Sequence, residues 1–504
     1  MLRRSCASSS RGLGTKLIKD MGHQTEALAC SNRREFFGYW MGPGTGKTRV
    51  ALKDAWREFE RGDIDAVLIL APNNVKADWI KWDHMKENAE DEDAVSVHLR
   101  DKLPRIIKGL WQSGATGKDK KSWAEFEDAI NRRHHKLIMI ATNYEALNVS
   151  QFFDFLAAFC KEYRVMIVAD ESTRIGKPGS RRTKRATKLA DLCKQRRALS
   201  GTPIVKSPLK MYSQARFLDK SAMPFKSFYA FRNTFCIMGG FQGRQVLSYK
   251  NLPYLSDLIS KFSYIKSKEE CLDLPPRVYL KRRVYMTPEQ MAAYKSMREE
   301  FFANVREDEI TANIVLAQQT RLAQITGGYL NKDGKIIEII PPDRNPKLLE
   351  AGQLIEDAPG QVVVWFRFRP ELEGMKQLLK PLLGKQPNYF EFHGGVPEKE
   401  RGAIKAAFKR GDRQILLGTE STGGIGINQF LVADTTIHVS SDYDTEKRIQ
   451  ADDRTHRIGS EIHEKITYYD IMVPNTVDAK IHSVLRGDTK LSAQILRQHW
   501  REWI

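Results

Sequence analysis

The sequence has few cysteines and no apolar segment long enough to cross a lipid bilayer. Its six cysteines lie far apart, and no two of them form a Cys-x-x-Cys pair, which argues against a disulfide framework and against a structural zinc site. No apolar run approaches the roughly 20 residues that a membrane-spanning helix needs. We therefore expect a soluble protein without a membrane partner, in the cytoplasm (of the host for a viral protein) or in the nucleus of a eukaryotic cell.

Acidic residues are also in deficit. The chain has 62 Asp and Glu against 81 Lys and Arg, which leaves a formal charge of +19. This balance suits a polyanionic partner such as nucleic acid, although charge alone does not separate DNA from RNA. With 504 residues, 41% of them hydrophobic, the chain can bury a sizeable core in two or more domains. Residues 1–15 begin basic and serine-rich without the amphipathic length of a transit peptide, and we expect them to be disordered.

A glycine-rich turn follows a short apolar run near the start of the chain. Residues 37–48 read Phe-Gly-Tyr-Trp-Met-Gly-Pro-Gly-Thr-Gly-Lys-Thr, and a helical pattern begins directly after them. The backbone N–H groups of such a turn, with the positive end of the helix behind it, bind a polyphosphate. A strict phosphate loop has glycine where this chain has Met41, but the rest of the pattern is intact. We expect ATP to bind Gly42, Gly44, Thr45, Gly46 and Lys47, with Mg²⁺ on Thr48.

Three more polar residues lie where ATP chemistry needs them. Gln24 opens a helix before the glycine turn, and its amide donates and accepts at once, which an adenine edge requires. Asp170 and Glu171 end a buried apolar run, where ligand-facing residues of open α/β sheets lie. We expect Asp170 to hold Mg²⁺ and Glu171 to orient and deprotonate the attacking water.

Apolar runs alternate with helical stretches in two blocks. Runs of this kind are typical of strands buried on both faces of a parallel sheet, and their alternation with helices implies βαβ units. We therefore predict an α/β fold with two doubly wound parallel-sheet domains and a helical insertion between them. The runs are residues 66–72, 136–144 and 164–171, then 361–366, 389–395, 413–419 and 435–440. The predicted ranges are 16–207 and 342–485 for the domains, 208–341 for the insertion and 486–504 for a helical tail.

Aromatic and basic residues interleave in the insertion. They can stack on bases, but at this density they are more typical of the core of a helical subdomain. They are Phe225, Phe228, Tyr229, Phe231, Phe235 and Phe241, with Lys226, Arg232 and Arg244.

Basic residues also gather in residues 174–197, directly after the acidic pair. Because they follow the expected ATP site, we favour contact with a nucleic-acid backbone over a solvated helix face. The candidates are Arg181, Arg182, Lys184 and Arg185. A small-residue turn follows, in which Ser200, Gly201 and Thr202 could sense the acidic pair and pass a shift onward.

Two arginines lie late in the second block. Arg454 and Arg457 are three residues apart, a spacing that shares one helix face. A rigid guanidinium is well suited to stabilise charge on a transferring γ-phosphoryl group. Because the second block carries no phosphate loop of its own, we interpret the pair as arginine fingers that reach across an interdomain cleft.

Taken together, these segments resemble the Swi/Snf-related branch of the second helicase superfamily, from about residue 16 to 485. The resemblance rests on an ordered set of motifs, of which Asp453-Arg-Thr-His-Arg-Ile-Gly459 is the most diagnostic. The others are His23-Gln24, Gly44–Thr48, Ala71-Pro72 with Trp79, Thr142–Tyr144, Asp170-Glu171, Leu199–Pro203, Leu274–Pro276, Arg321–Thr326, His393-Gly394, Gly423–Asn428 and Gln450–Gly459.

The resemblance implies two RecA-like domains that close on ATP while tracking along one strand of duplex DNA. It also implies that Gly426 contributes to the nucleotide site and Gln450 to the coupling segment. Further nucleic-acid contacts implied in this way are Asn143, Tyr144, His393, Thr419 and Asn428. The chain departs from the family where Ser172-Thr173 follows the acidic pair in place of a usual histidine, so coupling to the Ser200 turn would run through a hydroxyl. Lys206 stands near a usual asparagine.

We therefore predict a monomeric DNA-dependent ATPase that uses ATP and Mg²⁺ and remodels forked or branched DNA. An RNA-dependent helicase or a factor that displaces RNA polymerase is one alternative. A nucleotide-gated DNA-binding scaffold is another, although Glu171, Arg454 and Arg457 would then have no purpose.

Overall fold

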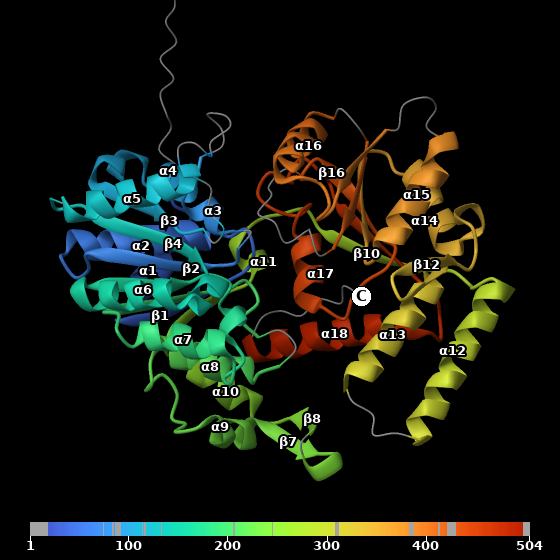
Figure 1. Cartoon of the computed structure of the whole chain (residues 1–504), viewed down its shortest axis with the longest axis horizontal. Helices are drawn as coiled ribbons and strands as arrows, with labels where there is room; N and C mark the ends of the chain where they lie inside the picture. The colour runs from blue at the N-terminus through green and yellow to red at the C-terminus, as the bar shows by residue number, and fades with distance from the viewer. Residues whose placement is uncertain are drawn as a thin grey trace, which may run out of the picture.

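The computed structural model places two parallel sheets side by side, each covered by helices. It describes residues 19–73, 75–82, 85, 92–112, 114, 117–132, 134–204, 207–243, 245–307, 312–382, 388–411, 414–420 and 430–496. The N-terminal segment 1–15, Gly426, Asn428, Lys206 and Arg244 lie outside these residues. In Figure 1 the first lobe is blue to green and the second is orange to red. Among the described residues, no helix combines the length and the apolarity that a membrane span requires.

The first lobe is built on a seven-stranded sheet in which every strand pairing is parallel. One of its inner strands, Ala-Val-Leu-Ile-Leu-Ala, is buried on both faces because helices cover both sides of the sheet. Its helices are α1 (Gly22–Cys30), α2 (Lys47–Glu60), α3 (Lys76–Trp79), α4 (Ala94–His98), α5 (Gly117–Asn131), α6 (Ser150–Glu162), α7 (Arg181–Ala190) and α8 (Lys210–Leu218). The strand order is β3 (Ile106–Leu110), β4 (Leu137–Asn143), β2 (Ala66–Ala71), β5 (Val165–Ala169), β6 (Gln195–Leu199), β1 (Phe36–Met41) and β9 (Ser263–Lys266).

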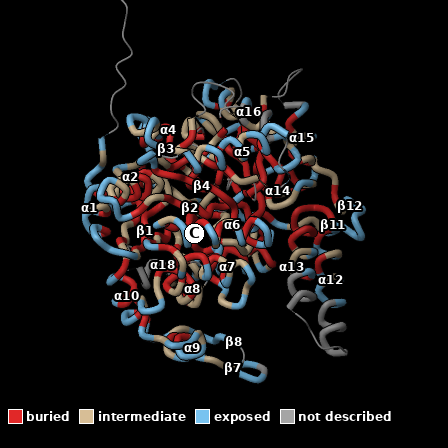
Figure 2. Tube along the Cα trace, turned by 60° about the vertical axis from the view of Figure 1, so that its left-hand side comes forward, coloured by how far each residue is buried: buried red, intermediate tan, exposed pale blue. Residues whose placement is uncertain are grey.

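The second lobe repeats this plan with a six-stranded parallel sheet. Its strands at Gln361–Phe366 and Ile415–Thr419 are almost fully buried, as are β2 and β4 of the first lobe, where the trace in Figure 2 is red. Its helices are α14 (Pro346–Glu356), α15 (Arg369–Leu382), α16 (Glu398–Arg410), α17 (Thr445–Asp452) and α18 (Val477–Leu496). The strand order is β10 (Arg277–Arg283), β17 (Ile466–Met472), β16 (Ala433–His438), β13 (Gln361–Phe366), β15 (Ile415–Thr419) and β14 (Tyr389–Phe392). The predicted α/β class with two doubly wound parallel sheets is confirmed.

The region between the lobes is less helical than its sequence indicates. It supplies an edge strand to each sheet, β9 to the first and β10 to the second, so the sheets extend beyond the predicted ranges 16–207 and 342–485. These strands are short or polar, and they contain no apolar run from which a strand could be predicted. The region also holds α9 (Phe228–Phe235), α10 (Leu252–Ser260), α11 (Lys268–Cys271), α12 (Pro288–Glu307), α13 (Ala312–Thr326), and the hairpins β7–β8 (Cys236–Gly239, Gln245–Tyr249) and β11–β12 (Tyr329–Lys332, Lys335–Glu338).

The aromatic residues of this region mostly form a core. Phe231 and Phe235 have no exposed surface, and Phe225 packs edge-on against both rings. Tyr229 is the exception, because 65% of it is exposed. The core alternative therefore describes these rings better than base stacking does.

Helix α18 bridges the two lobes. It begins in the second lobe and packs against α10 beside the first, and Leu491 reaches the hydrophobic core of the first lobe. Thr445 Oγ1 on α17 donates a hydrogen bond of 2.8 Å to Asp488 Oδ2 on α18. The predicted boundary at residue 485 thus falls inside one continuous helix.

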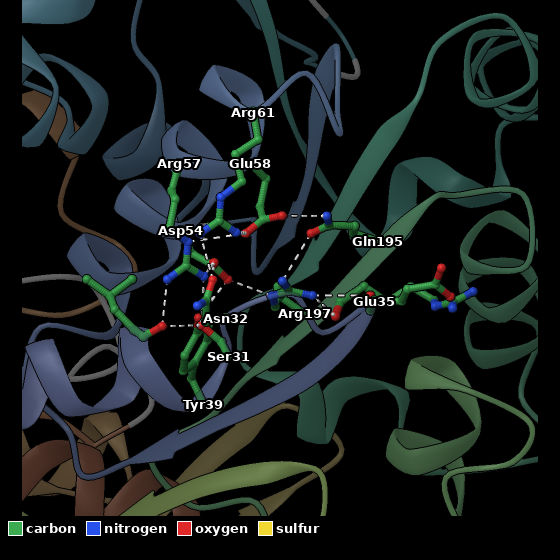
Figure 3. Close-up of polar contacts among 12 residues, drawn as sticks. Ser31, Asn32, Glu35, Tyr39, Asp54, Arg57, Glu58, Arg61, Gln195 and Arg197 are labelled. Atoms are coloured by element: carbon green, nitrogen blue, oxygen red, sulfur yellow. Dashed lines mark hydrogen bonds and ion pairs between the residues drawn. The ribbon is translucent and has the colours of Figure 1, made fainter.

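A buried ionic network fixes the strands that carry the glycine turn. Arg197 on β6 and Asp54 on α2 are both fully buried, and Arg197 Nε donates to Asp54 Oδ2 at 2.6 Å. Tyr39 on β1 donates to the same oxygen at 2.6 Å. Gln195 joins Arg197 to Glu58 through its two amide atoms (Figure 3). Because a buried charge is costly without its partner, this network holds β1, α2 and β6 in one arrangement.

Candidate active site

The glycine turn connects β1 to α2 in the conformation that the sequence predicts. Gly44 and Gly46 have positive φ angles of 80° and 86°, which L side chains rarely adopt. Gly46 is also the residue before the first turn of α2, and a Cβ atom there would lie 2.3 Å from Gln24 Nε2. Both positions therefore require glycine.

Lys47 folds back over this turn. Its Nζ atom donates to the carbonyl oxygens of Met41 at 3.0 Å and Gly42 at 3.2 Å. Burial lowers the pKa of Lys47, while the nearby carboxylates Glu171 and Asp170 oppose that shift. The ammonium thus lies between the turn and the acidic pair. Thr48 is half-buried in the first turn of α2.

Gln24 contacts the turn directly. It is almost completely buried, its Nε2 donates to Thr45 O at 3.1 Å, and its Oε1 accepts from Met21 N at 3.2 Å. A ring nitrogen of His23 lies 2.8 Å from the same Thr45 oxygen. The structure therefore brings Gln24 beside the expected phosphate site, and an adenine contact stays a prediction.

The acidic pair lies at the carboxyl end of β5. Asp170 Oδ2 accepts from Trp79 Nε1 at 2.8 Å, and Asp170 Oδ1 accepts from the backbone N of Glu171 at 3.0 Å. Glu171 has a left-handed backbone with φ of 49°, a strained conformation of the kind that functional sites hold. Burial raises the pKa of Asp170. Burial and the Asp170 charge raise the pKa of Glu171 to about 7.

The expected coupling turn packs on the glycine turn and is linked to the acidic segment through Gln214. A Cβ atom on Gly201 would lie 2.8 Å from Pro43 in the glycine turn, and Ser200 Oγ accepts from Thr202 N at 3.1 Å. Ser172 Oγ donates to Gln214 Oε1 at 2.6 Å, and Gln214 Nε2 donates to Pro203 O at 2.8 Å. A hydroxyl therefore does connect the acidic segment to this turn, through a glutamine that the sequence analysis missed.

Arg454 and Arg457 reach the first lobe from the second. The methylene groups of Arg457 cover the glycine turn, because a Cβ atom on Gly44 would lie 3.3 Å from Arg457 Cγ. Arg454 is 3% exposed, and neither Nε nor Nη1 has a hydrogen-bond partner among the described residues. Burial and the neighbouring Arg457 charge lower the pKa of Arg454 to about 9. Thr173 Oγ1 of the first lobe also donates to Glu446 Oε1 of the second at 3.0 Å.

The expectation that both arginines share a helix face is wrong. Helix α17 ends at Asp452, and the arginines lie in the turns that follow it. Gly459, with a φ of 103°, lies at the end of these turns. The spacing of three therefore reflects a compact turn. Gln450 is half-buried on α17.

The expected nucleic-acid residues fall into two groups. Tyr144 has no exposed surface and donates from its hydroxyl to Asp170 O at 2.6 Å, so it supports the acidic pair and offers no face to a base. Asn143, His393 and Thr419 are also buried, at 4%, 5% and 8% exposure. These four residues lie at or just beyond strand ends.

Helix α7 presents the expected backbone contacts unequally. Arg181 and Lys184 are exposed. Arg182 instead pairs with Glu145 at 2.7 Å, and Arg185 donates to Leu147 O and covers the ring of Phe153. Only the first two are therefore fully accessible to a polyanion. Arg197 from the same basic segment is buried in the ionic network.

The donors where the two lobes meet fit a nucleoside triphosphate with magnesium. The N-terminus of α2 and the glycine turn supply N–H groups for phosphate oxygens, and Arg454 supplies two buried donor atoms, Nε and Nη1, without a hydrogen-bond partner in the described part of the chain. Thr48 and Asp170 are oxygen ligands of the kind that Mg²⁺ prefers alongside substrate phosphates. Among the described residues there is no group of three or more His, Cys, Asp or Glu arranged for a metal.

Comparison with known proteins adds independent findings. The Mycoplasma genitalium protein named Uncharacterized ATP-dependent helicase MG018 is 25% identical over 337 residues, 66% of this chain and 30% of that protein. The Homo sapiens TATA-binding protein-associated factor 172 is 24% identical over 373 residues, 62% of this chain and 20% of that protein. The chain thus spans less than a third of the length of these relatives.

One solved structure also aligns along most of the chain. It is the Sulfolobus solfataricus SWI2/SNF2 ATPase core in complex with dsDNA, with 20% identity, a TM-score of 0.40, and coverage of 95% of this chain and 93% of that one.

Two family descriptions together match nearly all of the chain from the start of the first lobe to the turns that carry the arginines. Residues 346–459 match the Helicase conserved C-terminal domain. Residues 16–329, more than half of the chain, match the SNF2-related domain. The chain therefore belongs to the SNF2-related family of ATP-dependent helicases and translocases.

Proposed function

We propose that this protein is a DNA-dependent ATPase that moves along DNA and remodels forked or branched DNA. One observation carries the proposal: Arg457 of the second lobe covers Gly44 in the glycine turn of the first. When one site is formed by two lobes, each cycle of hydrolysis can change the position of one lobe relative to the other. A motor needs that coupling. The related helicase of Mycoplasma genitalium is named as ATP-dependent, which supports the use of ATP here.

Each residue of the cleft has a role in this proposal. Lys47 exchanges its carbonyl partners for phosphate oxygens, while Thr48 and Asp170 hold Mg²⁺, which would neutralise phosphate charge when bound. Glu171 takes the proton of the attacking water, a task suited by a pKa of about 7. Arg454 and Arg457 stabilise charge that develops on the γ-phosphoryl group.

The relay from Ser172 through Gln214 to Pro203 is the proposed coupling path. It connects the residue after the general base to the turn that packs on Pro43. A change at the γ-phosphate can therefore shift the segment that leads out of β6. Gln24 would bind the adenine edge. Gln450 would take part in the coupling through its place on α17.

The proposed partner is DNA rather than RNA, bound by the protein as a monomer. The charge of +19 supports a polyanion in general, and exposed Arg181 and Lys184 offer backbone contacts on α7. The elements α9 with β7–β8, and the pair α12 and α13, project from the body of the molecule in Figure 1. Such projections would give the protein further surfaces beside a bound duplex. A second arm of a branched substrate could contact them.

The test measures ATP hydrolysis with single-stranded, duplex, forked and four-way DNA and with RNA at one stated salt concentration. We expect the strongest stimulation by forked or four-way DNA, and no turnover by Lys47→Ala in spite of retained DNA binding. Equal or stronger stimulation by RNA would favour the RNA-dependent alternative. ATP binding without turnover under all conditions would favour a nucleotide-gated scaffold.

A further inference from the structure

We propose that Lys268 is a positioning residue that ties the two arginines of the second lobe to the phosphate loop of the first. The inference rests on the function proposed above and extends it to a residue outside the motifs that hold ATP. We call residues 453–457 the arginine turn.

Lys268 lies in the connection between the lobes. It begins the short helix α11, which follows β9 of the first sheet and precedes β10 of the second. Figure 1 shows α11 between the two halves of the molecule. One residue of this connection can therefore contact both lobes.

The backbone of Lys268 packs on the phosphate loop. A Cβ atom added to Gly42, the first residue of that loop, would lie 2.6 Å from Lys268 N and 2.9 Å from Lys268 Cβ. Gly42 N also donates to Lys266 O at 2.9 Å. The start of α11 and the start of the phosphate loop are thus in direct contact, and glycine is needed at position 42 to allow it.

The side chain of Lys268 points the other way, into the arginine turn. Its Nζ atom pairs with Asp453 Oδ1 and donates to His456 O. Lys268 is 3% exposed and Asp453 is 1% exposed, so solvent does not screen the pair. Asp453 directly precedes Arg454 in the chain, and His456 directly precedes Arg457. The single ammonium group of Lys268 therefore holds the arginine turn next to both arginines.

Two residues near the end of the connection fix the same turn, namely Pro275 and Arg277, the first residue of β10. Arg277 Nε donates to His456 Nδ1 at 3.1 Å, and the other ring nitrogen of His456 donates to Pro275 O at 2.9 Å. This pattern requires a neutral imidazole, and burial with nearby Arg277 lowers the pKa of His456 to about 3. Arg277 Nη2 also lies 3.7 Å from Asp453 Oδ1. The arginine turn is therefore held at several points, and the backbone of Lys268 also packs against Gly42.

The charges in this cluster agree with that role. Burial lowers the pKa of Lys268 to about 8, against the opposing effect of Asp453. Burial alone would raise the pKa of Asp453, but the charges of Lys268 and Arg277 hold it below its usual range. Lys268 is therefore mainly cationic at neutral pH and Asp453 is anionic.

A positioning role of Lys268 and a purely structural role predict different effects on turnover. An arginine finger contributes about 10³- to 10⁵-fold to turnover, and a displacement of about 1 Å in a positioned group can cost 10²-fold. If Lys268 only stabilises the fold, its loss lowers the melting temperature and leaves kcat of the folded enzyme unchanged. If it positions the arginines, kcat falls while nucleotide affinity is kept, because the fingers act on the transition state.

The experiment uses the full chain with Lys268→Met, Asp453→Asn and the double variant. Lys261→Met serves as the matched control because Lys261 is exposed on the same segment. We expect kcat to fall about 10- to 100-fold in each single variant, with the dissociation constant of a fluorescent ATP analogue within about twofold of wild type. The double variant should lose no more than Lys268→Met alone, because that substitution already removes the contact with Asp453.

Several outcomes would overturn the inference. The first is a wild-type kcat in folded Lys268→Met or in the double variant. The second is a loss of nucleotide affinity as large as the loss of kcat. The third is a double variant in which the losses of kcat of the two single variants add. Should the single variants unfold, the double variant decides alone, because removal of both charges of a buried pair is often tolerated. Absence of DNA-stimulated hydrolysis in the wild-type protein, or retained turnover in Lys47→Ala, would instead refute the proposed function itself, so the two failures are distinguishable.

Discussion

Glu171 should give the enzyme an acidic limb in its pH profile at an unusually high pH. The side chain is half-buried beside Asp170, and this burial together with the Asp170 charge raises its pKa to about 7. As a general base it works only when ionised. At pH 6 about one tenth of such a group is ionised, against about nine tenths at pH 8. We therefore expect kcat/KM to rise nearly tenfold between these two values.

The assay is steady-state ATP hydrolysis from pH 5.5 to 8.5 with saturating DNA and constant ionic strength. The slope of kcat/KM reports groups of the free enzyme. Glu171→Gln is the control: its rate should fall about 10²- to 10⁴-fold, and its residual rate should lack the limb near pH 7. A limb that persists in Glu171→Gln belongs to the substrate or to another group. A flat wild-type profile down to pH 5.5 would refute the reasoning.

The same shift has a consequence for stability. Because the folded-state pKa of Glu171 is raised, the folded chain binds the proton more tightly than the unfolded chain. The contribution of this group to the free energy of unfolding is therefore fully present below about pH 4.5 and is lost as pH rises through about 7. Catalytic competence and this contribution to stability thus change in opposite directions across the window.

Three further predictions follow from the buried network, the relay and helix α7. Arg197→Met leaves Asp54 without one buried partner and should lower the stability of the first lobe by about 3 kcal/mol. In thermal unfolding the melting temperature should fall by roughly 6–12 °C, and an equal fall in exposed Arg181→Met would contradict this. Gln214→Leu breaks the relay to Pro203 and should reduce DNA-stimulated kcat by about tenfold at unchanged nucleotide affinity, whereas unchanged stimulation would exclude the relay as the coupling path. Arg181→Ala should weaken DNA binding and reduce the slope of log K against log salt concentration by about one. Arg182→Ala should change neither, because Arg182 is paired with Glu145. A larger effect of Arg182→Ala than of Arg181→Ala would place DNA elsewhere.

The parts of the fold that could be predicted are those that local patterns determine. A glycine that must adopt positive φ, as at Gly44 and Gly46, is visible in sequence because few other residues replace it. Central strands such as β2 are visible because burial on both faces demands an apolar run. Edge strands β9 and β10 are partly solvated and polar, so their sequences carry no such signal.

The parts that could not be predicted depend on contacts between distant residues. Gln214 becomes part of the relay only because α8 packs beside the acidic segment. Lys268 looks like an ordinary charged residue until two lobes enclose it. Tyr144 looks like a surface aromatic in its motif, but the fold turns its hydroxyl towards Asp170. In each case the neighbour in space decides the role, and sequence spacing does not reveal that neighbour.

The central claim is that two lobes form one ATP site, with the first binding the triphosphate and the second supplying the positive charge that speeds its cleavage. Single-turnover hydrolysis by Arg457→Ala, measured beside the dissociation constant of a fluorescent ATP analogue, tests it most directly. We predict a loss of about 10³-fold or more in the rate of cleavage with affinity within about threefold of wild type, because the guanidinium acts on the transition state. Cleavage at the wild-type rate in Arg457→Ala would contradict the account.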